Sequence, residues 1–574
     1  MKGIYPYIKP FSGYICLTLI IKTAAAMAEL LIPYLMEYIL SLGGAPGDAS
    51  LVYLYGILMI ACAGVCLAFN ILANRMSAVS AGKITLNIRH DLFKKLMHLS
   101  AKQMDKLTIS SAESRLTSDT YNINQMLARV QRMGIRAPIL LIGGIGMMLL
   151  MDAGLALVLI TLLPVIALLV YFVTKHSIPL YTKQQSVLDR IVRTVQENIT
   201  GVRVIKALSK TEYEKDRFNN INAELTSIDE KAGSITAITN PASTLVLNLG
   251  LTVVVLMGAN RVRGGYSEPS AIVAFLQYFT LILNAMLGIT RIFVMLSKAE
   301  ASARRVVDVL HLPEDLLIQP SEVVHEPNPA HIEFKDVTFS YTGKGENISH
   351  LSFRLEHGQT LGILGSTGSG KSTVLNLLMR LYDPDKGQIL IDGKDIRSIE
   401  PAELRNKFGI VFQNDFVTEG DIAHNIRFFR DIPEFRLEVA AECAQAAGII
   451  AEKEAGMASA VAVRGNNLSG GQKQRLLIAR ALAGEPEILV LDDASSALDY
   501  RTDALLRRAL RQNYRNTTTV LVAQRISSLR HADLILVLSD GQVIGCGNHH
   551  ELIESCEEYQ IIAHTQMGAE EVGV

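Results

Sequence analysis

The chain has 574 residues, too many for a single hydrophobic core, so two or more domains are expected. Hydrophobic residues make up 49% of the sequence and charged residues only 19%, a balance typical of membrane proteins. The net charge of −1 gives no indication of nucleic-acid binding, and the six cysteines have no repeated spacing that would indicate a disulfide framework or a metal site.

Six apolar segments follow a short amphipathic stretch at the N-terminus. Each segment is long enough to cross a hydrocarbon core of about 30 Å as a helix, and none shows the alternation of a barrel strand. The predicted spans are residues 11–40, 51–75, 134–152, 155–174, 234–260 and 270–296. Residues 1–310 are therefore expected to form an α-helical membrane domain with six transmembrane helices.

Basic residues gather in two long connections, one after the second span and one after the fourth, whereas the three short connections carry only Arg261 and Arg263. The positive-inside rule then predicts a multi-pass protein of the cell membrane whose N- and C-termini are cytoplasmic. Apolar residues at helical spacing, as in 84–96, predict long cytoplasmic extensions of the spans. These extensions are expected to turn near residues 110–119 and 207–215.

Several polar residues interrupt the apolar spans. Ionisable groups at membrane depth usually face a partner or a cavity. Glu29 lies deepest and is the best of these candidates for facing a cavity, whereas Lys22, Glu37 and Arg291 could equally lie near the interface and extend toward it.

A linker with several prolines, residues 311–330, precedes a region in which strand-like and helix-like segments alternate, residues 331–565. This alternation predicts an α/β domain, which a short tail at 566–574 follows. Within it, a glycine-rich turn joins an apolar strand-like segment to a helix-like one. The turn consists of Gly365, Ser366, Thr367, Gly368, Ser369, Gly370, Lys371, Ser372 and Thr373.

This turn has the pattern of a phosphate-binding loop, GxxxxGK[ST]. Glycines let backbone N–H groups at a helix N-terminus surround phosphate oxygens. Lys371 would reach the β- and γ-phosphates, and Ser372 would offer its hydroxyl to Mg²⁺. The buried strand-like run that ends at Asp492 and the one before Gln413 place two further Mg²⁺ candidates where ligands bind in α/β sheets. The sequence therefore predicts a P-loop nucleotide-binding domain that takes ATP and Mg²⁺.

A second candidate anion site precedes the helix-like segment 473–483. It consists of Leu468, Ser469, Gly470, Gly471 and Gln472. A nucleotide has only one γ-phosphate, and the chain already has a loop for it. The second site is therefore expected to serve a nucleotide that another copy of the domain holds.

The order phosphate loop, Gln413, LSGGQ, ILVLDD and Ser496–Asp499 resembles the nucleotide-binding domain of the ABC transporter family. Six spans ahead of one such domain resemble an ABC exporter half-transporter. The resemblance implies a dimer that holds two nucleotides between two such domains, with LSGGQ contacting the opposite nucleotide. It also implies that Tyr341 stacks on adenine, that Asp499 belongs to the D-loop, and that the two cytoplasmic turns are coupling helices.

Two positions depart from the family pattern. Asp493 stands where the family generally has a glutamate that positions the attacking water, and Gln524 stands where it usually has a histidine. Aspartate is one methylene shorter, and a misplacement of about an ångström can cost on the order of 10²-fold in rate. Glutamine can hydrogen-bond a phosphate oxygen but carries no charge into the transition state.

Both departures concern this chain's own nucleotide, while the LSGGQ segment is intact. The pattern predicts an ATPase subunit, an ABC-type translocase, whose own site is poorly catalytic and whose partner is a second, non-identical half-transporter. The implied function is export of small hydrophobic or amphiphilic compounds, drugs or lipids, out of the cytoplasm or the inner leaflet of the bilayer; this cargo class rests on family analogy. Alternatives are a homodimeric lipid flippase or drug exporter, a peptide exporter, and a non-transporting ATP-gated sensor or channel.

Overall fold

The computed structural model describes residues 2–42, 49–313, 316–320, 330–413 and 416–567. The chain forms two compact units, of which the first is Met1–His98 with Ile109–Leu312 and the second is Leu99–Thr108 with Pro313–Val574. The segment Leu99–Thr108, which the sequence places among the membrane residues, thus belongs with the second unit. Most of the predicted linker and tail lies outside the described residues.

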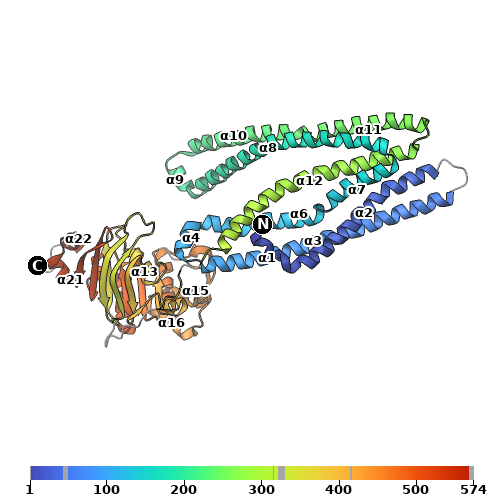
Figure 1. Cartoon of the computed structure of the whole chain (residues 1–574). Helices are drawn as coiled ribbons and strands as arrows, with labels where there is room; N and C mark the ends of the chain where they lie inside the picture. The colour runs from blue at the N-terminus through green and yellow to red at the C-terminus, as the bar shows by residue number, and fades with distance from the viewer. Residues whose placement is uncertain (1, 43–48, 314–315, 321–329, 414–415, 568–574) are drawn as a thin grey trace. The chain divides into compact units, whose positions relative to one another are not determined.

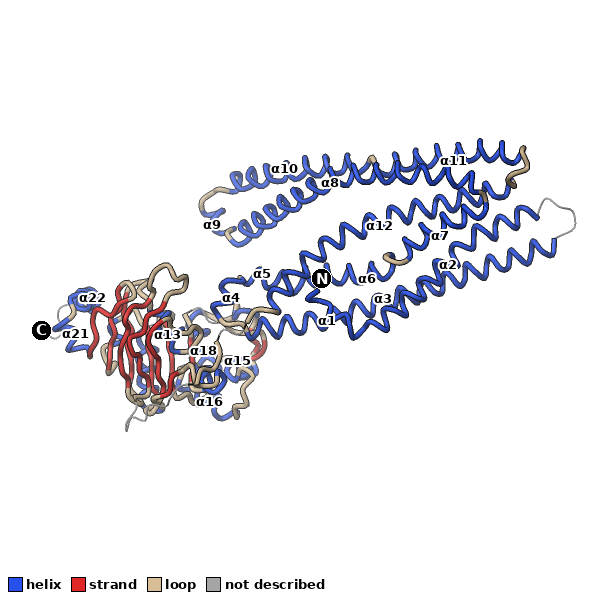
Figure 2. The backbone as a smooth tube through the Cα atoms, in the orientation of Figure 1, coloured by secondary structure: helices blue, strands red, loops and turns tan. Residues whose placement is uncertain are grey.

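Within the described ranges, six helices of the first unit are long and apolar enough to cross a membrane (Figures 1 and 2). This confirms the predicted six-helix membrane domain. The long extensions also form as single helices, namely α3 (Ala49–His98), α8 (Ala153–Thr200) and α12 (Pro269–Leu310). Leu54, Ile57 and Ile60 of α3 are mostly exposed, as expected of side chains that face lipid.

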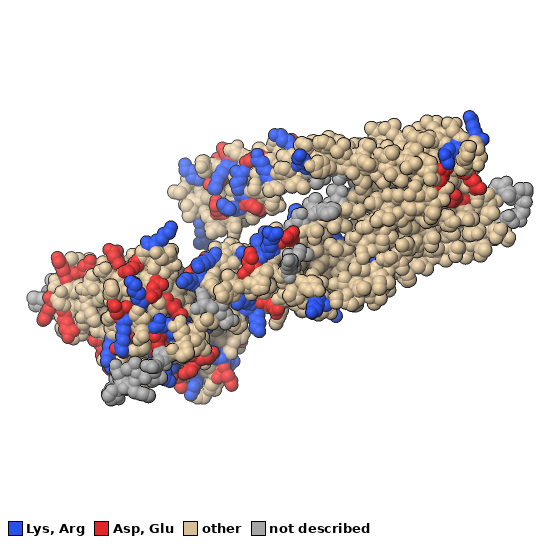
Figure 3. Space-filling view, in the orientation of Figure 1, with Lys and Arg blue, Asp and Glu red and all other residues tan. Residues whose placement is uncertain are grey.

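The core of the first unit is built around α12, which packs against α2 (Ser12–Leu42), α6 (Thr120–Met133) and α7 (Arg136–Met151). Phe275 and Phe279 are fully buried there, and the hydroxyl of Tyr278 donates to the carbonyl of Leu30 at 2.7 Å. Gly144 lets α7 approach α12 closely, because a Cβ at this position would lie 2.9 Å from a carbon of Ile282. In Figure 3 a broad zone of this unit is nearly free of charged residues.

The second long connection turns at α9 (Val202–Ala207), between α8 and α10 (Thr211–Ala237). The turn spans residues 201–210 and so begins a few residues before the predicted 207–215. Side chains join α8 to α10, for example Gln184 to Asp229 at 2.8 Å and Arg190 to Glu224 at 2.6 Å. The two helices lie side by side, as Figure 1 shows, and α11 (Thr239–Arg263) continues from α10 along α8.

The first long connection turns earlier than predicted, at α4 (Ala101–Leu107) instead of residues 110–119. Ser100 caps this short helix by accepting from the backbone N–H of Gln103 at 3.2 Å, and Thr108 ends it with a φ of 63°. Residues 109–114 form α5 and residues 115–119 a π-helical turn. The prediction of a turn there was wrong because Asp119 is buried and ion-paired to Arg305 of α12, which keeps the segment helical.

The second unit is an α/β domain with a six-stranded sheet in the order β12-β11-β3-β10-β9-β6, in which only β12 is antiparallel to its neighbour. Its strands are β3 (Thr360–Gly365), β6 (Phe408–Val411), β9 (Ile488–Asp492), β10 (Thr518–Val522), β11 (Leu534–Ser539) and β12 (Gln542–Gly547). A four-stranded sheet in the order β2-β1-β4-β5 consists of β1 (Ile332–Phe339), β2 (Ile348–Leu355), β4 (Lys386–Ile391) and β5 (Lys394–Asp395). This confirms the predicted α/β fold.

Alternating residues of the central strands pack into two different cores. Val490 and Val520 face the core shared with the antiparallel sheet and α13 (Lys371–Leu378), whereas Leu489 and Leu521 face the core that contains α18 (Gly470–Leu482). Burial on both faces explains why these strands read as continuous apolar runs. The phosphate loop and the LSGGQ segment thus each begin a helix that packs against the parallel sheet.

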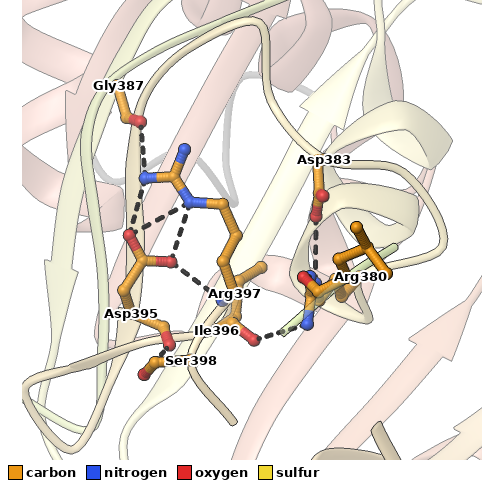
Figure 4. Close-up of polar contacts among 8 residues, drawn as sticks. Arg380, Asp383, Gly387, Asp395, Ile396, Arg397 and Ser398 are labelled. Carbon is orange, nitrogen blue, oxygen red and sulfur yellow. Dashed lines mark hydrogen bonds and ion pairs between the residues drawn. The ribbon is translucent and has the colours of Figure 1, made fainter. Parts of the chain in front are cut away.

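Two arginines attach the described part of the linker to the second unit. The buried Arg380 donates to Asp383 at 3.0 Å and to the carbonyls of Ile396 and Leu317 (Figure 4 shows the first two). The guanidinium of Arg397 is ion-paired to Asp395 at 2.6 Å, and its backbone carbonyl accepts from the N–H of Gln319. Buried charges need such partners. In the same unit, the hydroxyl of Tyr382 donates to Asp105 of α4 at 2.5 Å.

Candidate nucleotide-binding site

A cavity of about 440 Å³ lies at the carboxyl ends of β3, β9 and β10. This is the edge of a parallel sheet where ligands usually bind. The predicted site residues that line the cavity are Thr367, Gly368, Gly370, Lys371, Ser372, Thr373, Gln413, Asp492, Asp493 and Gln524. Gly365, Ser366 and Ser369 complete the loop without lining the cavity.

The glycines of the loop are required by its backbone. Gly370 precedes α13 with a φ of 104°, and a Cβ there would lie 2.7 Å from a side-chain carbon of Ile348. A Cβ on Gly365 would lie 2.4 Å from the carbonyl oxygen of Leu538. The loop therefore places backbone N–H groups at the N-terminus of α13, a geometry suited to phosphate.

Three charged or polar groups meet beside the loop. The ammonium of Lys371 donates to the carbonyls of Gly365 and Ser366 at 2.8 and 2.7 Å, and the hydroxyl of Ser372 donates to Asp492 at 3.3 Å. Burial raises the pKa of Asp492, although the hydrogen bond from Ser372 and the charge of Lys371 oppose that shift. An oxygen-rich pair of this kind fits a hard cation such as Mg²⁺.

The two departures from the family pattern contact each other. The side-chain amide of Gln524 donates to Oδ2 of Asp493 at 3.3 Å. Asp493 itself has a φ of 51°, and its N–H donates to the carbonyl of Val522 at 3.0 Å. Burial raises the pKa of Asp493, while the charges of Lys371 and Arg525 lower it. The carboxylate at the position of the family's glutamate is therefore engaged by a neutral amide.

Tyr341 lies after β1 and is about one-third exposed. Its hydroxyl accepts from Asn376 at 3.1 Å and lies 3.4 Å from the hydroxyl of Thr373 in the phosphate loop. Its ring packs edge-on against Phe339 and Tyr382, which fixes its orientation beside the loop. Tyr341 thus lies beside Thr373 of the loop but does not itself line the cavity.

The LSGGQ segment does not line the cavity. Ser469 and Gln472 form a capping box at the N-terminus of α18, and Ser469 and Gly470 are exposed. A Cβ on Gly471 would lie 3.0 Å from the carbonyl oxygen of Ala497, so a side chain there would crowd the turn before α19 (Tyr500–Asn513). Asp499 caps α19 by accepting from the N–H of Thr502 at 2.8 Å. The second anion site therefore faces solvent in the single chain.

Several residues of this region were not predicted. Glu346, Asn347, Asp540 and Gly541 line the cavity, although no phosphate-binding motif includes them. Gly541, in the β11–β12 turn, donates its N–H to the carbonyl of Ser369 at 3.2 Å. Gln566, which the sequence assigns to the tail, lies in α22 (Glu557–Met567) and donates to the carbonyl of Gln524 at 2.8 Å.

A membrane unit of six helices followed along the chain by a P-loop domain is the organisation of an ATP-driven membrane transporter. Comparison with known proteins agrees with this class of protein. Residues 15–286 match the ABC transporter transmembrane region, and residues 348–496 match the ABC transporter domain. The chain belongs to the ABC transporter family and is an exporter half-transporter.

Individual relatives cover nearly the whole chain. An ABC transporter ATP-binding protein of Mycobacterium tuberculosis is 31% identical over 99% of this chain and 98% of its own length. A fatty acid ABC transporter ATP-binding/permease protein of Mycobacterium bovis is 32% identical over 83% of this chain and 76% of its own. The solved structure of a bacterial Atm1-family ABC exporter with ATP bound has a TM-score of 0.81 at 25% identity, with 98% of both chains covered.

Proposed function

We propose that this chain is the hydrolysis-impaired subunit of a heterodimeric ABC exporter for amphiphilic compounds. It binds ATP and Mg²⁺ at its own phosphate loop, with Ser372, Gln413 and Asp492 as the Mg²⁺ residues. Its LSGGQ segment serves the competent site of a different partner subunit. The observation that carries the proposal is the hydrogen bond between Asp493 and Gln524 beside an otherwise complete nucleotide site.

The chemistry of this pair supports retention of ATP with little hydrolysis. Phosphoryl transfer depends on a well-positioned water and on charge stabilisation of the γ-phosphate. The short carboxylate of Asp493 is engaged by Gln524, and Gln524 supplies no positive charge. Lys371 and Ser372, to which we assign nucleotide and Mg²⁺ binding more than water activation, lie in the loop and contact Ser366 and Asp492. Binding is therefore expected to survive where catalysis fails.

Two exposed features support a partner subunit. The LSGGQ segment lies outside the lining of the chain's own nucleotide cavity, and its capping box fixes the exposed N-terminal end of α18. At the other exposed feature, α9 has no buried residue, and Val202, Val204 and Leu208 around it are 43%, 61% and 64% exposed. Exposed apolar residues at the tip of a helical hairpin fit burial against a partner chain.

Polar groups within the membrane helices support an amphiphilic cargo. The ammonium of Lys22 donates to the amide oxygens of Asn70 and Asn74 at 2.6 and 3.2 Å. Among the described residues, no carboxylate contacts this ammonium directly. Glu29 is ion-paired to Arg136 at 2.6 Å. Charged and amide groups among apolar helices suit a molecule with a polar head and an apolar body. A fatty acid transporter among the relatives is consistent with such cargo.

The cycle follows from differential binding to the closed dimer. ATP at both sites would draw the nucleotide-binding domains together, because each γ-phosphate gains contacts from the opposing LSGGQ segment. Closure would act on α4 and α9 and turn the membrane cavity outward, with both termini in the cytoplasm. Hydrolysis at the partner's site would reset the dimer while this chain keeps its ATP.

The proposal is tested by ATPase assays in lipid nanodiscs. The chain alone should bind ATP with very low turnover, and co-purification with the native partner should raise turnover sharply. Amphiphilic compounds should stimulate the complex further and accumulate in inside-out vesicles. Robust ATPase activity of the chain alone would contradict the impaired site, and a complex without transport would favour a sensor or channel.

A further inference from the structure

Two histidines and an aspartate from three separate turns converge on one point of the second unit. His331 lies just before β1, His357 lies in the turn between β2 and β3, and Asp392 lies in the turn between β4 and β5. One ligand atom from each of the three lies within 4.8 Å of the others. His357 precedes β3, whereas the phosphate loop follows the same strand. The cluster is therefore at the edge of the sheet opposite the nucleotide cavity.

Hydrogen bonds fix the position of His331. Its Nδ1 lies 2.6 Å from the hydroxyl of Thr518, which also accepts from the N–H of Gly358 at 3.0 Å. Its backbone carbonyl accepts from the N–H of Asp392 at 3.1 Å. These contacts hold all three turns together before any ligand arrives.

The other ring nitrogen of His331, Nε2, has no hydrogen-bond partner in the part of the chain that the structure describes. The residue is fully buried, and its Nε2 makes no hydrogen bond among the described residues. Buried polar atoms without partners are rare in folded proteins, because such an atom forfeits its hydrogen bonds to water. The His357 ring stacks on that of His331 with their centroids 3.9 Å apart, and the Nε2 of His357 lies 2.9 Å from Asp392.

The charges around the cluster favour binding of a cation. Lys407 lies 3.6 Å from Asp392, but it is closer to Glu487, at 2.5 Å. The two carboxylates and one ammonium give this group a net charge of −1 when both histidines are neutral. His357 is mostly exposed, so its ring is free to tilt toward a shared ligand without rearranging the core.

We propose that His331 through Nε2, His357 and Asp392 form a binding site for a divalent transition-metal ion of the Zn²⁺ class. Two imidazoles and one carboxylate are a common Zn²⁺ ligand set, and water would complete a tetrahedral geometry. With Nε2 on the ion, the Nδ1–H of His331 donates to Thr518, a typical second contact of a metal-bound histidine. The ion would tie the first residues after the linker to two turns of the nucleotide-binding domain.

Zn²⁺ binding by the full-length chain in nanodiscs tests the site directly. The chain is purified with a histidine-free tag, stripped with a chelator and titrated with Zn²⁺ in competition with a chromophoric chelator. His357→Ala is the main variant because His357 is exposed. His350→Ala is the matched control, since His350 is an exposed histidine paired to Asp336 at 2.6 Å that belongs to no such cluster among the described residues.

The site predicts that the wild type and His350→Ala bind one more Zn²⁺ than His357→Ala does, or bind it at least tenfold more tightly. Co²⁺ should give a tetrahedral visible absorption in the wild type that is lost in His357→Ala and in Asp392→Asn. Zn²⁺ should raise the Tm of the wild type but not the Tm of His357→Ala or Asp392→Asn. Equal Zn²⁺ stoichiometry and affinity in the wild type and His357→Ala would overturn the proposal. Those results would leave His331, His357 and Asp392 as a hydrogen-bonded cluster only.

Discussion

Gln524 and Asp493, at the ends of adjacent strands β10 and β9, are joined by a hydrogen bond of 3.3 Å between the amide nitrogen and a carboxylate oxygen. In this arrangement two side chains that line the same cavity, and that we propose face the γ-phosphate, interact with each other. A carboxylate oxygen that accepts from a neutral amide has fewer lone pairs left to hold and orient an attacking water. This hydrogen bond would give the proposed impairment of hydrolysis a structural cause beyond the shorter side chain of Asp493.

Restoring the family residues should restore catalysis. In Asp493→Glu with Gln524→His, the longer carboxylate would reach the water and the imidazole would supply charge, so the chain alone should gain at least about tenfold in kcat for ATP. Each single substitution should give a smaller gain in kcat than the double variant gives. Adding Lys371→Ala to the double variant serves as the control and should remove the gain. An unchanged kcat in the double variant would show that the impairment has another origin.

Asp492→Asn should stabilise the nucleotide-free chain at neutral pH. Burial raises the pKa of Asp492 above its ordinary value of 3.8, so the ionised carboxylate is disfavoured in the folded state above that raised pKa. The Tm difference between variant and wild type should therefore be full at pH 7 and shrink as the pH falls through the raised pKa. In the presence of Mg²⁺ and ATP the order should reverse, because the variant loses a cation ligand. If the variant without nucleotide has a lower Tm than the wild type, burial of the ionised Asp492 carboxylate does not destabilise the folded chain.

Tyr341→Ala should weaken ATP binding, whereas Tyr341→Phe should have little effect. A stacked aromatic ring contributes roughly 1–3 kcal/mol to base binding, which corresponds to about five- to 150-fold in Kd. The contacts of the Tyr341 hydroxyl with Thr373 and Asn376 are expected to matter less than the ring face. Fluorescent-nucleotide titration in nanodiscs measures both variants. Equal Kd values for the alanine variant and the wild type would show that adenine does not stack on this ring.

The ion pair between Glu29 and Arg136 should stabilise the membrane unit. Their side chains are 17% and 33% exposed, so loss of one partner should cost about 1–3 kcal/mol by leaving the other charge at membrane depth. Glu29→Leu and Arg136→Met should each lower the Tm in nanodiscs, and the double variant should recover much of the loss. Glu300→Ala, which removes an exposed pair with Arg304, should leave the Tm unchanged. Additive effects of the two single variants would exclude a direct pair.

Much of the fold follows from short-range patterns. The six spans were predictable because about 20 consecutive apolar residues have few alternatives to a membrane helix. The central strands were predictable from unbroken apolar runs, as in Ile488–Leu491. The phosphate loop was predictable because its chemistry depends on neighbouring residues in one turn.

The features that sequence reasoning missed depend on contacts between distant residues. The turn at Ser100 was placed too late because the helix after Thr108 is held by Asp119 and Arg305, which are 186 positions apart. Asp540 and Gly541 reach the nucleotide cavity only because β11 pairs with β3. The partners of Lys22 and Glu29 likewise lie on other helices, so their pairing could not be read along the chain.

The most direct test of a non-identical partner is the mass of the native assembly. The complex, purified from its own membrane by a tag on this chain, is measured by native mass spectrometry. We predict one chain of 62.8 kDa together with one chain of a different mass, and a partner sequence with glutamate and histidine at the positions that match Asp493 and Gln524. A dimer of twice 62.8 kDa would contradict the heterodimer.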